Sequence, residues 1–152
     1  MNILNARGFA AVALLAALQS ALPQPALAAA EPVRHRFLCV DNGRNQLIHV
    51  DQFQPGKSWA TPVPEGPRDL QILTGAGQKE RVLLSHGKGA TEYDLATGQP
   101  SGWAVDRYSG IQSAVRLPDG HTLLARVDGT VFEVDADGKE LGVIQPKSKV
   151  DI

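Results

Sequence analysis

The chain has 152 residues, of which 43% are hydrophobic and 20% are charged, and its formal net charge at pH 7 is −1. A chain of this length can bury one modest core, and its near-neutral charge balance argues against nucleic acid or another polyelectrolyte as a partner. The single cysteine, Cys39, excludes an internal disulfide.

Residues 1–30 have the composition of a cleavable secretory signal. Arg7 precedes the apolar run 9–18, which polar residues and prolines interrupt before it is long enough to span a membrane. The small residues that follow predict cleavage after Ala28 or Ala30. We therefore expect a periplasmic or secreted product with no membrane segment after cleavage.

Residues 31–152 are predicted to form one β domain, because short runs of alternating apolar and polar residues are separated by turn residues and no helical period is present. Turns are clearest at Pro118-Asp-Gly120 and at Asp128-Gly129. Strands are expected at 37–41, 47–51, 58–63, 69–74, 81–85, 90–95, 102–105, 111–117, 122–126, 130–135 and 140–144.

The strands repeat. Three of them run into the aspartates Asp51, Asp94 and Asp135, which stand 43 and 41 residues apart. A period near forty with several short strands per period is the signature of β-propeller blades. The predicted fold class is therefore all-β, with antiparallel four-stranded meanders repeated as propeller-like blades.

The predicted ring is incomplete. The first unit shows only three strands, and its inner strand is either missing or supplied by residues 32–36 or 146–152. About three blades fall short of the roughly four to eight of closed propellers. The chain is then a piece of a longer propeller, or several copies assemble as a homo-oligomer that closes the ring, or the meanders curl into a barrel or sandwich.

The turns after the anchoring aspartates resemble a known repeat. The segment Asp94-Leu-Ala-Thr-Gly-Gln-Pro-Ser-Gly-Trp103 is similar to the blade repeat of PQQ-like (quinoprotein-type) propellers, and residues 37–51 resemble an NHL-type blade. The resemblance covers about residues 37–144. It implies that Trp59 and Trp103 pack between neighbouring blades, and it implies little about activity, because propellers host many unrelated functions.

Signals for catalysis are weak. A quinoprotein dehydrogenase would need an acidic calcium site and often adjacent cysteines, which this sequence lacks. The histidines His35, His49, His86 and His121 do not have metal-ligand spacing, and no nucleophile or phosphate-loop motif occurs. We predict no catalytic residue, no metal site and no cofactor.

In propellers, the loops from the second to the third strand and from the fourth to the next first strand meet on the face that usually binds ligands. Here those loops are 41–45, 65–69, 86–89, 106–109 and 126–129. Their basic side chains could form a mouth for an acidic or hydroxylated ligand. Alternatively, the aspartates of the same loops pair with these basic groups. The candidate ligand-binding residues are Asn42, Arg44, Arg68, Asp69, His86, Lys88, Arg107, Tyr108 and Arg126.

The sequence thus favours an exported, non-catalytic propeller-like module that binds a partner protein or a small polar ligand. One alternative is a periplasmic hydrolase or lyase completed by oligomerisation. Another is a truncated propeller with no independent activity.

Overall fold

The computed structural model describes residues 32–75 and 77–145, and its strands all belong to one compact unit that begins at Arg34. The expected signal peptide and the tail 146–152, one proposed source of an inner strand, lie outside these residues. In the part of the chain that is described, no helix is long and apolar enough to cross a membrane.

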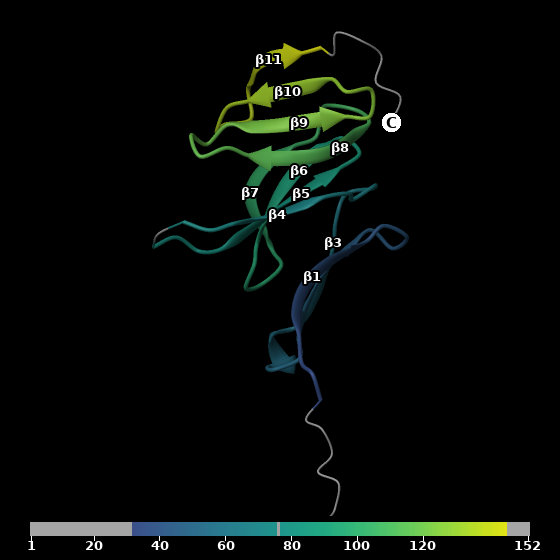
Figure 1. The fold of residues 1–152 in the computed structure, drawn as a ribbon, viewed down its shortest axis with the longest axis vertical. Helices are drawn as coiled ribbons and strands as arrows, with labels where there is room; N and C mark the ends of the chain where they lie inside the picture. Colours follow the sequence, from purple (N-terminus) through teal and green to yellow (C-terminus); the bar gives the residue numbers. More distant parts are fainter. Residues whose placement is uncertain (1–31, 76, 146–152) are drawn as a thin grey trace, which may run out of the picture. The chain divides into compact units, whose positions relative to one another are not determined.

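The fold is all-β, with three antiparallel sheets in which consecutive strands are neighbours (Figure 1). Sheet I contains β1 (Arg36–Asp41), β2 (Gln46–Asp51) and β3 (Trp59–Pro62), with the 3-10 turn η1 (Pro55–Lys57) before β3. Sheet II contains β4 (Leu70–Leu73), β5 (Arg81–His86), β6 (Gly89–Asp94) and β7 (Pro100–Val105). Sheet III contains β8 (Ile111–Arg116), β9 (Thr122–Arg126), β10 (Val131–Val134) and β11 (Glu140–Ile144).

All eleven predicted strands are confirmed, and no strand end shifts by more than two residues. The pairing also confirms the division into one unit of three strands and two units of four. Residues 32–36 do not supply a fourth strand to sheet I, because Arg36 already begins β1 and residues 32–35 are not in a strand.

Sheet II is buried on both faces because successive side chains of a strand point to opposite sides. Val82, Leu84 and Tyr93 pack with Leu47 of sheet I in one hydrophobic cluster. The alternate residues of the same strands face the other way: Leu83, Ala90 and Val105 pack in a second cluster with Ile111, Leu124 and Val134 of sheet III. The strands of sheet II therefore hold the molecule together.

Two tryptophans dock each sheet onto the next. Trp59 of β3 donates its indole N–H to the carbonyl of Leu95 at 3.1 Å, in the turn between β6 and β7. Trp103 of β7 donates in the same way to Ala136 at 2.9 Å, in the turn between β10 and β11. The prediction that both tryptophans pack between units is confirmed, and the polar end of each indole is satisfied inside the junction.

The turns that receive the tryptophans are shaped by aspartate and glycine. Asp94 Oδ1 accepts the backbone N–H groups of Ala96 and Thr97, each at 2.9 Å. Gly98 then closes the turn at φ +71°, a conformation that favours glycine. A Cβ atom on Gly98 would lie 2.5 Å from the Trp59 ring, so the glycine also makes room for the indole.

We expect Gly98→Ala to destabilise the fold more than Gly66→Ala. Both glycines have nearly the same φ, +71° and +72°, so both variants carry the strain of a left-handed alanine, about 1–2 kcal/mol. Only Gly98→Ala also displaces the Trp59 ring, and such overpacking costs about 1–3 kcal/mol more. Urea unfolding followed by tryptophan fluorescence measures both free energies. Equal losses would mean that the contact with Trp59 contributes nothing.

Candidate functional site

The loops predicted to share one face do meet at one end of the sheets. The N–H of Gly87, in the turn between β5 and β6, donates to Glu65 O at 3.2 Å, in the loop before β4. The N–H of Val127, in the turn between β9 and β10, donates to Gly110 O at 3.0 Å, in the loop before β8. Backbone bonds thus tie each connecting loop to a hairpin turn of an adjacent sheet.

Two of the candidate arginines are paired within their own turns. Arg44 Nη1 lies 3.9 Å from Asp41 Oδ2 on the surface. Arg126 Nε donates to Asp128 Oδ1 at 2.8 Å, and this hydrogen-bonded guanidinium holds the pKa of the Asp128 carboxyl far below its ordinary value. These two arginines are therefore paired with aspartates of their own turns, which neutralise charge that could otherwise attract an acidic ligand.

Arg107 and Tyr108 are neighbours, but the contacts of sheet III hold them. Arg107 donates to the carbonyl of Gly138 at 2.6 Å. The Tyr108 hydroxyl donates to Glu140 at 2.8 Å, and its ring stacks on Phe132 with centroids 4.3 Å apart. Both side chains thus fasten the loop after β7 to β10 and β11.

The other candidates are divided between surface and interior. Asn42, Arg68 and Lys88 are exposed. Asp69 Oδ2 accepts the hydroxyl of Ser113 at 2.7 Å, which links the start of β4 to β8. Of the nine candidate residues, only the exposed ones could contact a ligand at this end of the sheets.

His86 is buried beneath these loops and serves the structure. Its Nε2 lies 3.2 Å from the Thr91 hydroxyl, and its Nδ1 accepts the backbone N–H of Lys88 at 3.4 Å. With Nδ1 accepting, the ring proton is assigned to Nε2 and the imidazole is neutral. Burial is the main cause that lowers its pKa; the Lys88 charge adds to the shift and the Asp106 charge opposes it.

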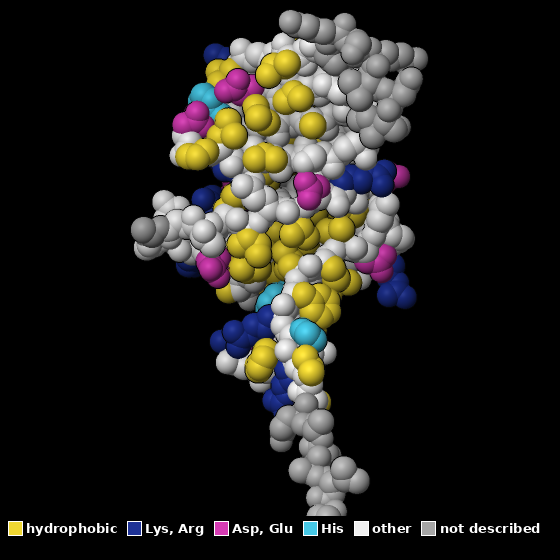
Figure 2. Space-filling model, viewed as in Figure 1, with side chains coloured by type: hydrophobic (Ala, Val, Ile, Leu, Met, Phe, Trp, Pro, Cys, Tyr) yellow, Lys and Arg dark blue, Asp and Glu magenta, His cyan; other side chains and the backbone are white. Residues whose placement is uncertain are grey.

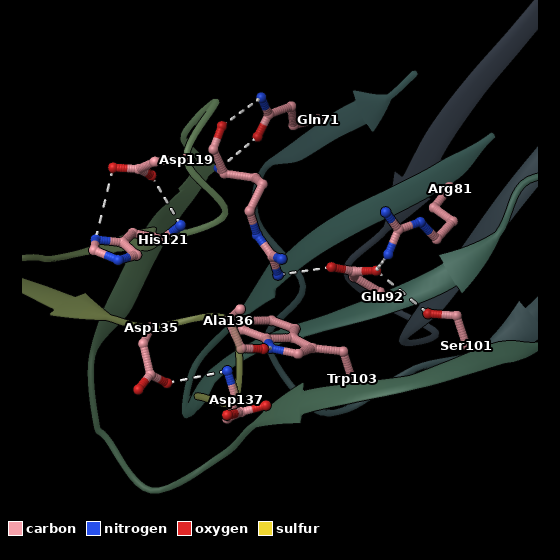
Figure 3. A network of polar contacts seen from close by, with 11 residues as sticks. Gln71, Arg81, Glu92, Ser101, Trp103, Asp119, His121, Asp135, Ala136 and Asp137 are labelled. Atoms are coloured by element: carbon pink, nitrogen blue, oxygen red, sulfur yellow. Dashed lines mark hydrogen bonds and ion pairs between the residues drawn. The ribbon is translucent and has the colours of Figure 1, made fainter. Parts of the chain in front are cut away.

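A polar network that the sequence did not predict lies between sheets II and III. We call it the Glu92 network: Glu92, Arg81, Arg116, Ser101 and Gln71. Arg81 Nη1 donates to Glu92 Oε2 at 2.5 Å, and Ser101 Oγ lies 3.5 Å from the same oxygen (Figure 3). Arg116 Nη2 lies 2.6 Å from Glu92 Oε1. The side chain of Glu92 is 0% exposed, against 36% for Arg81 and 14% for Arg116, so the carboxylate is enclosed and the arginines reach outward.

Arg116 is held from several directions. Gln71 Oε1 accepts its backbone N–H at 2.7 Å, Gln71 Nε2 donates to its carbonyl at 3.3 Å, and its guanidinium lies 4.3 Å from the centre of the Trp103 ring. The Nη2 contact to Glu92 is close but is not aligned as a hydrogen bond, and Nε has no acceptor among the described residues. Burial lowers the pKa of Arg116. Two guanidinium groups and one carboxylate leave this cluster with one excess positive charge.

The Glu92 network borders a surface hollow of about 610 Å³. Arg81 and Arg116 line it together with residues of β4 and of the turns after β4 and β8. The candidate ligand-binding loops precede β4 and β8, whereas this hollow is lined by the turns that follow these strands. The hollow is therefore at the opposite end of the two strands from those loops. A second hollow of about 710 Å³ lies beside sheet I at that same end, with Phe37, Leu38 and Lys57 among its lining residues.

One signal in the sequence could have revealed the network. Glu92 stands two residues after the buried Ala90 on a strand, so it points to the same, apolar side. A charged residue at that position requires a partner of opposite charge. The residues that partner it, Arg81 and Arg116, come from different strands and could not be identified from their spacing. Within residues 32–75 and 77–145, no three His, Cys, Asp or Glu side chains are placed to hold a metal ion.

We expect Glu92→Gln to lower the free energy of unfolding by about 3 kcal/mol or more, because it leaves two partly buried guanidinium groups without a counter-ion. The control is Glu133→Gln, on β10. Glu133 is paired with His121, whose Nδ1 lies at 2.8 Å, but both side chains are about one third exposed, so a much smaller loss is expected. Urea unfolding measures both variants. A loss for Glu92→Gln no larger than for the control would contradict this assignment.

The buried His86 predicts acid sensitivity. Its pKa is below 6.5 in the folded protein, so on acidification the unfolded chain takes up a proton that the folded chain resists. The contribution of His86 to stability is therefore present at neutral pH and is lost as pH falls below 6.5 through the folded pKa. His86→Gln, whose amide can accept from Lys88 and donate to Thr91, should lose less stability between pH 7 and pH 5. Parallel stability curves for the two proteins would refute this role.

Comparisons with known proteins give little beyond this geometry. No family model matches the sequence, and no protein of curated function matches it either. The chain is similar to the crystal structure of a protein of unknown function from Bacteroides caccae, with 22% identity over 73% of this chain and a TM-score of 0.47. The matched region spans 40% of the length of that protein.

Proposed function

We propose that the chain is an exported, non-catalytic module of β-propeller type that binds a small polar anion at the Glu92 network. Its placement outside the cytoplasm rests on the composition of residues 1–30. The propeller assignment is supported by the meanders themselves: β4 and β8, the first strands of two successive sheets, are joined through Gln71 and the backbone of Arg116. First strands of successive blades lie side by side around a propeller axis.

The excess positive charge at the floor of the hollow carries the functional proposal. A buried carboxylate would be neutralised by one guanidinium, and here Glu92 has two. Arginine pairs suit carboxylate and phosphate groups, because the planar guanidinium donates to two oxygens at once. Arg116 Nε is buried, so an anion in the hollow would bind the exposed part of Arg81 and be attracted by the excess charge beneath it.

The size and remaining lining of the hollow favour a small hydroxylated ligand. Its volume of about 610 Å³ is within the usual range for small-molecule sites. Thr74 and Gln78 on the turn after β4 also line it and offer neutral hydrogen-bonding groups. Asp119 stands on the rim, where its Oδ1 accepts the backbone N–H of His121 at 3.0 Å. The ligand class is therefore a small carboxylate or phosphate with hydroxyl groups.

Calorimetric titration of citrate, glucuronate and inorganic phosphate into the purified protein tests the site. We expect at least one of these anions to bind, and Arg81→Lys to weaken its binding by about tenfold or more, the loss expected for one charge-assisted hydrogen bond. Lysine keeps the positive charge beside Glu92 but removes the planar fork, so the fold is preserved. Thermal unfolding of the unliganded variant verifies this.

The matched control is Arg68→Lys, on the exposed loop before β4 at the other end of the sheets. If Arg68→Lys weakens binding and Arg81→Lys does not, the ligand binds at the loop end predicted from the sequence, and the Glu92 network is not the site. Equal effects of both variants, or no binding of any of the three anions, would also reject the proposal.

A further inference from the structure

Sheet III has one apolar face that nothing in the described part of the chain covers. The face consists of Val115, Leu123, Ala125, Val131 and Ile144, and we call it the outer face of sheet III. The strand register places these residues on one side, since Val115 pairs with Leu123, and Val131 pairs with both Ala125 and Ile144. Figure 2 shows hydrophobic side chains gathered over this sheet. The other face of sheet III is the one packed on sheet II.

Sheet I also has one apolar face that the described residues leave uncovered, on the side away from sheet II. Its outer face consists of Phe37, Cys39, Ile48 and Val50, which pair across β1 and β2 as Phe37 with Val50 and Cys39 with Ile48. Phe37 is exposed, although it is large and hydrophobic. The alternate residues of the same strands, such as Leu38 and Leu47, pack against sheet II.

The repeat shows what each bare face is built to contact. Val50, Tyr93 and Val134 each stand just before an anchoring aspartate. Tyr93 packs in the cluster with sheet I and Val134 in the cluster with sheet II, so in both cases this position faces the preceding sheet. Val50 occupies the same position on sheet I. The outer face of sheet I is therefore equivalent to the face with which sheets II and III pack against the sheet before them.

The same reasoning applies to sheet III. Glu92 and Glu133 each stand two residues before an anchoring aspartate, and Glu92 faces the following sheet, where it meets Arg116. Glu133 is on the outer face side of sheet III, because it pairs with Leu123. The outer face of sheet III is therefore equivalent to the face of sheet II that the following sheet covers. The outer face of sheet I is equivalent to the face with which a sheet covers the preceding one, so the two uncovered faces are suited to pack against each other.

Their charges are complementary as well. Residues 32–63 carry four basic and two acidic side chains, a net charge of +2, whereas residues 111–145 carry three basic and six acidic side chains, a net charge of −3. Arg34 precedes β1, at the end of sheet I that corresponds to the position of Glu133 on sheet III; Arg36, the first residue of β1, is paired with Asp51 and does not belong to the outer face. Opposite charges on two surfaces favour their association and fix its orientation.

We infer that the outer face of sheet III binds the outer face of sheet I of a second copy of this chain. Two such contacts related by a twofold axis join sheet III of each copy to sheet I of the other. The resulting ring has six sheets, within the range of about four to eight that closed propellers use. Both apolar faces are then buried in each copy.

Light scattering coupled to size-exclusion chromatography measures the mass in solution, and we expect twice the mass of one chain. Ile144→Asp, on the outer face of sheet III, should convert the dimer to a monomer. Val127→Asp is the control, because Val127 is similarly exposed, 51% against 60% for Ile144, but lies in the turn between β9 and β10. A monomer in the unmodified protein, or a dimer unaffected by Ile144→Asp, overturns the inference.

Cys39 gives a second readout that reports on the contact itself. It is the single cysteine and lies on the outer face of sheet I. In the dimer, iodoacetamide should alkylate Cys39 slowly, and Ile144→Asp, a change on sheet III, should accelerate the reaction while Val127→Asp should not. If Cys39 reacts at the same rate in all three proteins, sheet I is not the partner surface. Protection of Cys39 in a monomer would instead show that another segment of the chain covers it.

Discussion

The structure depends on one constraint: a sheet with two apolar faces must have both of them covered. Sheet II meets this condition, because Val82, Leu84 and Tyr93 are buried on one side and Leu83, Ala90 and Val105 on the other. Sheets I and III meet it on one side only. The tryptophan contacts follow from the same stacking, since each indole crosses a junction and donates to the next turn. The stacking of sheets thus explains the core, the junctions and the two bare faces.

Stacking also explains where charge is buried. Glu92 points into the junction between sheets II and III, where an isolated carboxylate would be very costly. Arg81 from its own sheet and Arg116 from the next provide the compensating charge, and Trp103 lies against Arg116. The junction therefore combines apolar packing with a cationic surface that opens into a hollow. The candidate site is a consequence of how the sheets pack, and its arginines are held in place by that packing.

The sequence predicted much of the fold and little of the site. All eleven strands were recognised from local patterns, and the docking of Trp59 and Trp103 was expected from the resemblance to a propeller repeat. The end of the sheets at which loops meet was also recognised. However, Arg107 and Tyr108 are held by Gly138, Glu140 and Phe132, and His86 is buried on Thr91. These contacts join residues whose separation in the chain follows no motif.

By itself, the sequence determined where strands begin and end, which side chains share a face and which turns repeat. These properties depend on alternation and on the backbone preferences of aspartate and glycine, which act between residues close in the chain. Only the tertiary structure decided which charges meet. Glu92 and Arg116 stand on different sheets, and their approach is set by the packing of one sheet on another. For the same physical reason, the outer faces of sheets I and III could be defined only after sheet II had been seen to cover their other sides.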